Sequence, residues 1–289
     1  MLKIRVIGVL ILKNELVVQS IGFKRYLPVG RPDIAVEYLN KWGIDEIAIL
    51  DITSGPAGTS PAYWKLKEYS KCCHVPLSVG GGVKTLSDIE SLIRSGADKV
   101  IINTAFHKTP DLITRGAEKF GNQCMVVSID ACRTGKDSYE VYIASGQTNT
   151  GKTPVETAIE AQKAGAGEIL LNSIDNDGMK KGYDSALLHS VVKAVDIPVI
   201  ICGGAHLPIH MIEGIRHGAS AVAAANFFHY TEHSVMMHKT VIKSNGFDIR
   251  TDTYAGYRMD QVGCDGRNRK MNDCMLEELR FEYVPEERI

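Results

Sequence analysis

Residues 75–107 read VPLSVGGGVKTLSDIESLIRSGADKVIINTAFH, and residues 197–229 repeat this stretch as IPVIICGGAHLPIHMIEGIRHGASAVAAANFFH. Each position of the second copy lies 122 residues after its counterpart, and no gap interrupts the 33 positions. Each copy contains an apolar run, a glycine turn, an amphipathic helix and a second apolar run, which is the pattern of a β-turn-α-β unit. A gapless repeat of this length indicates a duplicated structural unit.

The rest of the chain alternates in the same way between apolar runs and helical patterns. Besides the strands of the two repeat units, we predict strands at residues 4–12, 46–51, 125–130 and 168–172. Helices are expected at residues 32–42, 61–72, 111–120, 154–164, 185–195 and 232–245. Residues 13–20 resemble a short strand, residues 21–31 a flexible basic loop, and residues 132–145 an inserted hairpin.

Eight strand-helix units without a linker predict an α/β protein of the (β/α)8 TIM barrel class. The alternative, a doubly wound sheet, would need edge strands, and none of the predicted strands has that character. Because the 122-residue offset also relates Glu46 to Glu168, we expect two half-barrels related by a pseudo-twofold axis. Residues 1–250 would form the barrel, and residues 251–289 a C-terminal extension of unknown role. The extension either serves a changed set of partners or is a disordered or barrel-packing segment.

Composition and charge exclude several classes of function. The net charge is −1 and no long basic run occurs, so a nucleic acid is not an expected partner. No run of 18 apolar residues occurs, so no membrane span is expected. The apolar run at residues 6–12 follows basic residues, but it is short and no small-residue cleavage site follows it, so a buried strand is expected there rather than a signal peptide. The seven cysteines contain no Cys-x-x-Cys pair, so no metal or other cofactor is expected. Their odd number suits a reducing compartment and favours a cytoplasmic protein.

Glycine turns and the loops beside them provide two candidate anion sites at the carboxyl end of the barrel. Glycine lets a phosphate approach backbone N–H groups, and the helix N-termini that follow favour negative charge. Ordinary βα turns are the alternative, but two symmetric sets favour a ligand with a phosphate at each end. The first site comprises Gly80, Gly81, Gly82, Asn103 and Thr104, and the second comprises Asp177, Gly178, Gly203, Gly204, Ala225 and Asn226.

Asp51 and Asp130 each end a predicted strand and are the candidate catalytic acid/base groups. The alternative is that each aspartate is solvated or caps a loop. Comparison of the halves places Ile11 at the position that corresponds to Asp130. Because isoleucine can neither accept nor donate a proton, a symmetric acid/base pair is absent.

Specific motifs occur along the chain: VGGG at residues 79–82, GADKV at 96–100, SIDA at 128–131, GAGEILL at 165–171 and GYD at 182–184. Together they resemble the cyclase subunit of imidazole glycerol phosphate synthase, the HisF family. The resemblance covers residues 4 to about 250. It implies that a glutaminase subunit docks at the N-terminal face of the barrel and that its ammonia passes through the barrel. The ammonia would reach a bisphosphorylated substrate at the mouth.

The resemblance also implies roles for individual residues. A ring of charged residues, the ammonia gate, maps onto Arg5, Glu46, Lys99 and Glu168, and Asp98 and Gln123 match positions that face the glutaminase. Structural ion pairs that close the barrel floor are the alternative for the ring.

The mouth departs from the family pattern. The first catalytic aspartate falls on Ile11, a lysine of the first loop on Gln19, a serine on Asn226 and a threonine on Asn172. One acid/base group contributes about 10²- to 10⁴-fold to a rate. We therefore hypothesise a paralogue that receives ammonia but delivers it to a sugar amidotransferase of surface-polysaccharide synthesis. An active cyclase of histidine biosynthesis is the alternative, and a phosphosugar isomerase, which would also want a carboxylate at residue 11, ranks last.

Overall fold

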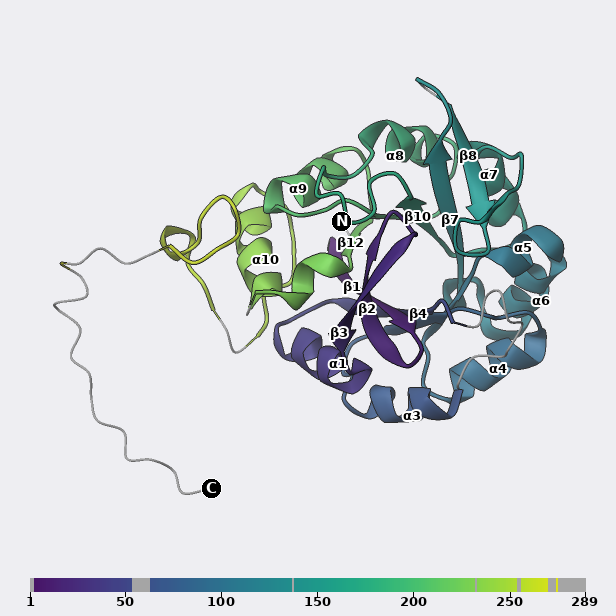
Figure 1. Cartoon of the computed structure of the whole chain (residues 1–289), viewed down its shortest axis with the longest axis horizontal. Helices are drawn as coiled ribbons and strands as arrows, with labels where there is room; N and C mark the ends of the chain where they lie inside the picture. Colours follow the sequence, from purple (N-terminus) through teal and green to yellow (C-terminus); the bar gives the residue numbers. More distant parts are fainter. Residues whose placement is uncertain are drawn as a thin grey trace.

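The structure, a computed structural model, describes residues 3–53, 63–136, 138–231, 233–253, 256–269 and 274. Within this part of the chain, eight parallel strands form a closed barrel, because β12 pairs with β1 and β10 pairs with β7. The predicted TIM barrel is confirmed (Figure 1). Its strands are β1 (Arg5–Lys13), β4 (Glu46–Asp51), β5 (Leu77–Gly80), β6 (Lys99–Ile102), β7 (Met125–Arg133), β10 (Glu168–Ser173), β11 (Val199–Cys202) and β12 (Ala221–Ala224).

Helices surround the barrel and follow its strands in the chain (Figure 1). They are α1 (Pro32–Lys41), α3 (Tyr63–Lys71), α4 (Leu86–Arg94), α6 (Asp111–Phe120), α7 (Pro154–Lys163), α8 (Ser185–Val192), α9 (Pro208–Arg216) and α10 (Ser234–Ser244). Every predicted helix is present. The first residues of the helix expected at 61–72 lie outside the described residues.

The duplication is visible in the element bounds. The strands β4, β5 and β6 and the helix α4 reappear, shifted by 122 residues, as β10, β11, β12 and α9, with no difference at either end of any element. The same local sequence pattern therefore produces the same local structure in both halves, as the repeat predicts.

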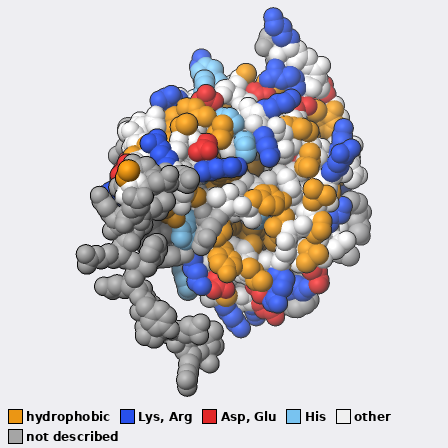
Figure 2. All heavy atoms as spheres, turned by 60° about the vertical axis from the view of Figure 1, so that its left-hand side comes forward, with side chains coloured by type: hydrophobic (Ala, Val, Ile, Leu, Met, Phe, Trp, Pro, Cys, Tyr) orange, Lys and Arg blue, Asp and Glu red, His pale blue; other side chains and the backbone are white. Residues whose placement is uncertain are grey.

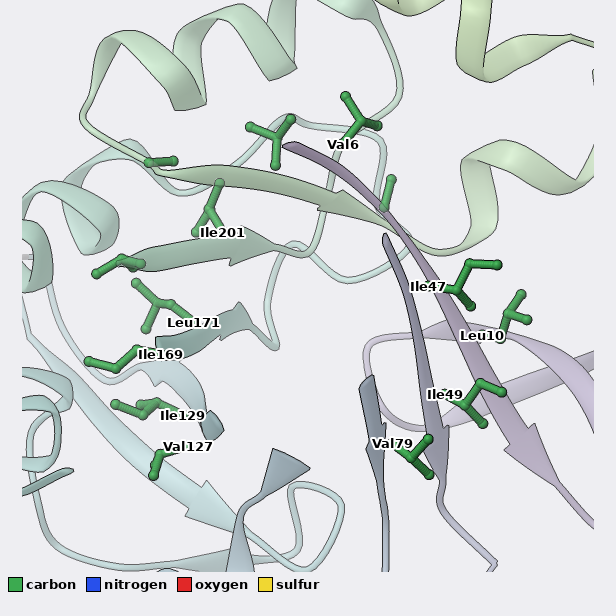
Figure 3. Close-up of a cluster of buried hydrophobic side chains, with 14 of the residues drawn as sticks. Val6, Leu10, Ile47, Ile49, Val79, Val127, Ile129, Ile169, Leu171 and Ile201 are labelled. Atoms are coloured by element: carbon green, nitrogen blue, oxygen red, sulfur yellow. The ribbon is translucent and has the colours of Figure 1, made fainter. Parts of the chain in front are cut away.

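Strand alternation divides the core into two layers. Outward-facing residues of the strands pack against the helices in one large cluster, and Figure 3 shows Val6, Ile47 and Ile201 among them. Inward-facing residues form a second cluster that fills the barrel, with Ile7 and Leu170 among its members. Such a filled interior is typical of TIM barrels.

Two hairpins are added to the barrel, each after the first strand of a half-barrel. The second hairpin, β8 (Tyr139–Ile143) with β9 (Thr148–Asn149), agrees with the predicted insertion at residues 132–145. The first consists of β2 (Leu16–Ile21) and β3 (Arg25–Gly30), which pair antiparallel. The prediction of a flexible loop at residues 21–31 was therefore wrong, because residues 25–30 of this stretch pair with β2.

The chain after α10 returns to the amino-terminal end of the barrel and then packs on its outside. Ile249 forms a bridge with Ile4, and Arg250 Nε donates to Asp45 Oδ1 at 3.1 Å. Further on, Val262 is fully buried in the outer hydrophobic cluster, directly after the short helix η3 (Met259–Gln261). Among the described helices, none is long and apolar enough to cross a membrane.

Candidate functional site

The glycine turns after β5 and β11 have a backbone that other residues would strain. Gly81 and Gly203, which lie 122 residues apart, have φ values of 107° and 95°. A Cβ on Gly81 would lie 2.1 Å from the Asp51 carbonyl oxygen, and one on Gly203 would lie 2.7 Å from that of Ser173. Glycine is thus required at both turns by the same close approach of the neighbouring strand.

The loops after β6 and β12 match each other in the same way. Asn103 has φ −117° and ψ −88°, and Ala225 has φ −99° and ψ −80°. Each residue precedes a short helical turn, α5 (Thr104–Lys108) or η2 (Asn226–His229). The structure therefore brings the members of each predicted anion site together at the carboxyl end of the barrel, in two equivalent arrangements.

The next residue of each loop holds a hairpin over the mouth. Thr104 Oγ1 accepts a hydrogen bond from the Ala144 N–H at 3.1 Å, in the turn between β8 and β9. At the equivalent position, Asn226 Oδ1 accepts from the Ser20 N–H at 3.1 Å, and Asn226 Nδ2 donates to the Ser20 carbonyl at 2.7 Å. Both residues were predicted to bind phosphate, and in the structure both anchor a hairpin.

Asp177 of the second predicted site is bonded to the first hairpin. Ser20 Oγ and the Phe23 N–H donate to its Oδ2 at 2.6 and 3.3 Å, and the Gly22 N–H donates to its carbonyl at 2.9 Å. Burial raises the pKa of Asp177, although the bond from Ser20 acts in the opposite direction. The tip of the hairpin is thereby fixed beside Gly178.

Asp130 lies at the mouth, 8% exposed, near the carboxyl end of β7. Asn103 Nδ2 donates to its Oδ2 at 3.2 Å, and Ser128 Oγ donates to its Oδ1 at 3.3 Å. Burial raises the pKa of Asp130 to about 7, against the hydrogen bonds from Ser128 and Asn172. A carboxyl group with a pKa near neutrality can both donate and accept a proton under ordinary conditions.

The position equivalent to Asp130 is apolar. Asp130 pairs in register with Asn172, and Ile11 pairs with Leu50, which lies 122 residues before Asn172. Ile11 is 8% exposed and belongs to the inner cluster together with Val18. The register thus places Ile11 where the half-barrel comparison put it.

Asp51, the other predicted acid/base residue, is not brought together with Asp130. Its Oδ1 accepts a hydrogen bond from the Thr53 N–H at 2.8 Å, within its own loop. In β4, Ile47 and Ile49 face the helices, whereas Ala48 faces the barrel interior. Strand alternation puts Asp51 on the side of Ile49, away from the interior.

At the amino-terminal end of the barrel, the four predicted gate residues form one ring of ion pairs. Arg5 contacts Glu46 Oε2 and Glu168 Oε1, both at 2.6 Å. Lys99 Nζ contacts the Oε2 atoms of the same two glutamates at 2.9 and 2.8 Å. Burial acts to lower the pKa of Arg5, but the two glutamates raise it above its ordinary value. The inner apolar cluster lies between this ring and the mouth.

Asp98 and Gln123, the predicted glutaminase-facing residues, are both exposed at the same end of the barrel, beside the first residues of β6 and β7. Asp98 Oδ2 accepts a hydrogen bond from the Leu77 N–H at 2.8 Å, so one of its oxygens holds the neighbouring strand.

The sequence did not point to several residues near the second anion site. The Tyr230 hydroxyl donates to Gln19 Oε1 at 2.8 Å and so adds a bond to the first hairpin. Lys180, His206 and Arg267 line a cavity at this site. His206 lies in the second repeat copy, but its counterpart in the first copy is Lys84, so the duplication does not single it out. Lys180 is a loop residue between Gly178 and Gly182, and Arg267 lies in the extension, so no local signal marks them.

A closed (β/α)8 barrel with duplicated glycine turns at its mouth and an ion-paired floor defines the class of two-fold repeated α/β barrels. The family described as "Histidine biosynthesis protein" matches residues 5–234. The chain belongs to this family, and within it to the HisF-like proteins.

The relatives agree with this membership. A protein named imidazole glycerol phosphate synthase subunit hisF2, from Vibrio vulnificus (strain YJ016), is 40% identical over 267 residues, which cover 91% of this chain and 98% of the relative. The imidazole glycerol phosphate synthase subunits HisF of two Dehalococcoides mccartyi strains, BAV1 and CBDB1, are each 43% identical over 254 residues, which cover 87% of this chain and 100% of the relative.

Proposed function

We propose that this chain is the synthase-type subunit of a glutamine amidotransferase complex that conducts ammonia but does not perform the cyclase reaction. A glutaminase docked at the amino-terminal face would release ammonia beneath the ring of Arg5, Glu46, Lys99 and Glu168. A phosphorylated ligand would occupy the glycine turns at the mouth. The observation that carries the proposal is the pairing of a complete ion-pair ring with an isoleucine at position 11.

The floor and interior support the conduction of ammonia. The inner cluster between the ring and the mouth is apolar and includes the small residues Ala48, Ala221 and Ala223. Neutral ammonia enters an apolar layer far more readily than ammonium does, because burial of an unpaired charge is strongly unfavourable. The apolar layer above the ring would therefore admit ammonia and hold back ammonium.

The mouth argues against ordinary cyclase chemistry. Asp130 has an environment suited to proton transfer, but the opposite strand offers Ile11, and Gln19 is engaged by Tyr230. The cyclase reaction needs a proton-transfer group on each side of its substrate. Asp130 can supply one of these groups here, and Ile11 cannot supply the other. Asp51 would then serve the first glycine turn as a loop-capping residue.

The extension supports a divergent role. A match to 91% of this chain must continue past residue 250 wherever it begins, so the hisF2 protein of Vibrio has a counterpart of part of the extension. The 254 aligned residues of the HisF proteins span those relatives completely. We infer that the ammonia passes to a separate amidotransferase that acts on a sugar of a surface polysaccharide.

The direct test is a cyclase assay with the purified chain, the bisphosphorylated ribulosyl aminoimidazole carboxamide substrate and ammonium salt. Turnover at least about 10²-fold below that of an authentic cyclase is expected from the loss of one acid/base group. The double variant Ile11→Asp/Gln19→Lys should then gain activity. Turnover of the unchanged chain within about tenfold of the authentic enzyme would contradict the proposal and favour the alternative, an active cyclase subunit.

Docking of the glutaminase is tested separately by co-purification of the two chains. Asp98→Lys should abolish it, because a charge reversal on an exposed docking face opposes association. Asp98→Asn is the matched control, since an amide oxygen can still accept the Leu77 N–H. Co-purification that survives Asp98→Lys would place the docking surface elsewhere.

A further inference from the structure

The second anion site opens into a cavity of about 400 Å³. The sequence predicted the glycine turn and its partner loop, but it did not predict this cavity. Gly203, Gly204 and Asn226 line it, as expected for the glycine turn and its partner loop. The extension lines it as well, through Asp265 and Arg267. The chain thus adds a segment from outside the duplicated barrel to one of two otherwise equivalent sites.

Several contacts fix the extension at the cavity. Val262 is fully buried and forms an antiparallel bridge with Asn268. The Gly263 N–H donates to the Arg267 carbonyl at 2.7 Å. Gly266 lies so close to α10 that a Cβ there would be 2.3 Å from Cε1 of His238. Arg267 is therefore presented by a packed turn rather than by a loose tail.

Two cations without counter-ions converge on this cavity. Within the described part of the chain, neither the Lys180 ammonium nor the Arg267 guanidinium has a hydrogen bond or an ion pair. Lys180 has φ +60°, a strained conformation for a lysine, in the loop between β10 and α8. Burial lowers the pKa of His206, and the nearby charges of Lys180 and Arg267 lower it further. Like charges gathered in this way favour the binding of an anion.

The two acidic residues of the cavity, Asp177 and Asp265, make other contacts and form no ion pair with these cations among the residues that the structure describes. Asp177 is bonded to Ser20 and to the backbone of the first hairpin. Asp265 Oδ1 accepts the backbone N–H of Arg267 at 3.1 Å, within the turn of the extension. Figure 2 shows the face that carries α10 and the extension, where Lys, Arg and His side chains gather near the centre.

The cavity also holds one buried acceptor. His238, 1% exposed, places Nδ1 2.7 Å from the Ser234 carbonyl, and its Nε2 has no partner. The carbonyl assigns the proton to Nδ1, so Nε2 is left as a hydrogen-bond acceptor. Such an atom suits a hydroxyl group next to the anionic part of a ligand, as in a sugar phosphate.

We propose that the C-terminal extension is part of the ligand site, in which Arg267 and Lys180 bind a phosphomonoester seated on the turn of Gly203 and Gly204. This inference rests on the proposed binding of a phosphorylated ligand at the mouth. It gives the extension a role in recognition of the ligand, and it adds the side chains of Lys180 and Arg267 to the second anion site.

The test is an NMR titration of the full chain with glycerol 3-phosphate, a simple phosphomonoester that carries two negative charges above about pH 7. The amides of Gly204 and Ala225 report on the second site, and those of Gly82 and Thr104 report on the first. Arg267→Gln should weaken binding at the second site about tenfold, a change equivalent to about 1.4 kcal/mol, and leave the first within about twofold. Arg269→Gln, a neighbouring exposed arginine outside the cavity, is the matched control.

The outcomes separate this inference from the proposed function. If wild-type protein binds at both sites and Arg267→Gln leaves both affinities within about twofold, the role of the extension is refuted while phosphate binding stands. If the amides of Gly204 and Ala225 never respond in the wild-type protein, the inferred role of the extension and the proposed phosphate binding both fail at this site. A purely structural effect of Arg267→Gln would persist at high salt, whereas loss of an exposed charge should have much less effect there. Persistence would therefore also overturn the inference.

Discussion

Replacement of Ile11 by aspartate (Ile11→Asp) tests whether the mouth opposite Asp130 is an apolar environment. The Ile11 side chain is 8% exposed and packs in the inner cluster beside Val18. Truncation of a buried isoleucine costs about 2–5 kcal/mol. Asparagine has the shape of aspartate but does not titrate. The Ile11→Asn variant should therefore lose about 3 kcal/mol of stability at every pH.

Ile11→Asp should lose more than Ile11→Asn, and the difference should grow as pH rises above about 4. Burial raises the pKa of the new carboxyl group, as it raises that of Asp130 to about 7. The unfolded chain has a pKa near 3.9, so below that pH both states are protonated and the two variants match. As pH rises from the unfolded pKa to the folded pKa, the native state loses stability progressively, and above the folded pKa the loss is constant. At about 1.4 kcal/mol per unit of elevation, an elevation of about two units predicts an extra loss of about 3 kcal/mol at pH 8.

Urea unfolding of both variants at about pH 4.5 and pH 8 measures this difference directly. If Ile11→Asp and Ile11→Asn differ by less than about 0.5 kcal/mol at both pH values, water reaches position 11. A carboxylate would then be tolerated there at no cost, and the apolar environment that supports the proposed function would not exist.

Three further outcomes follow from the site. Asp130→Asn should gain stability relative to the wild type as pH rises from about 4 to about 7, because the raised pKa of Asp130 makes the wild-type native state less stable over that range. Thermal unfolding of both proteins across this pH range tests the sign of the difference. Glu46→Gln, at a residue 1% exposed, should cost about 3–5 kcal/mol in urea unfolding and more than Glu168→Gln, whose side chain is 12% exposed. Asn226→Ala removes two bonds to Ser20, so hydrogen exchange at the first hairpin should accelerate about tenfold, whereas unchanged exchange would show that these bonds do not hold it.

The sequence was sufficient for the features that depend on local pattern and on strand register. Glu46 and Glu168 begin equivalent strands, so a closed barrel necessarily brings them to the same end. Gly81 and Gly203 were recognisable because a close approach of neighbouring backbone leaves no room for a side chain. These properties follow from short-range geometry, which the repeat displays twice.

Features that depend on long-range contacts could not be predicted in the same way. Pro28 and Gly30 made residues 21–31 resemble a loop. The structure places β3 there, in a hairpin held by Asp177 and Asn226 of the second half-barrel. The position of Arg267 depends on the burial of Val262 and on the fit of Gly266 against α10. No periodicity in the extension indicates either contact.

The two halves of the barrel show which properties the fold itself enforces. The turns at Gly81 and Gly203 have the same conformation because the neighbouring strand leaves no room for a side chain at either position. The fold therefore retains both glycine turns whether or not a phosphate binds there. Nothing in the fold requires a carboxylate at position 11. Isoleucine there joins the inner cluster and avoids the burial of a charge, so the barrel is more stable without the proton-transfer group than with it. A chain that needs only to bind a phosphorylated ligand and pass ammonia would be expected to carry an apolar residue at this position.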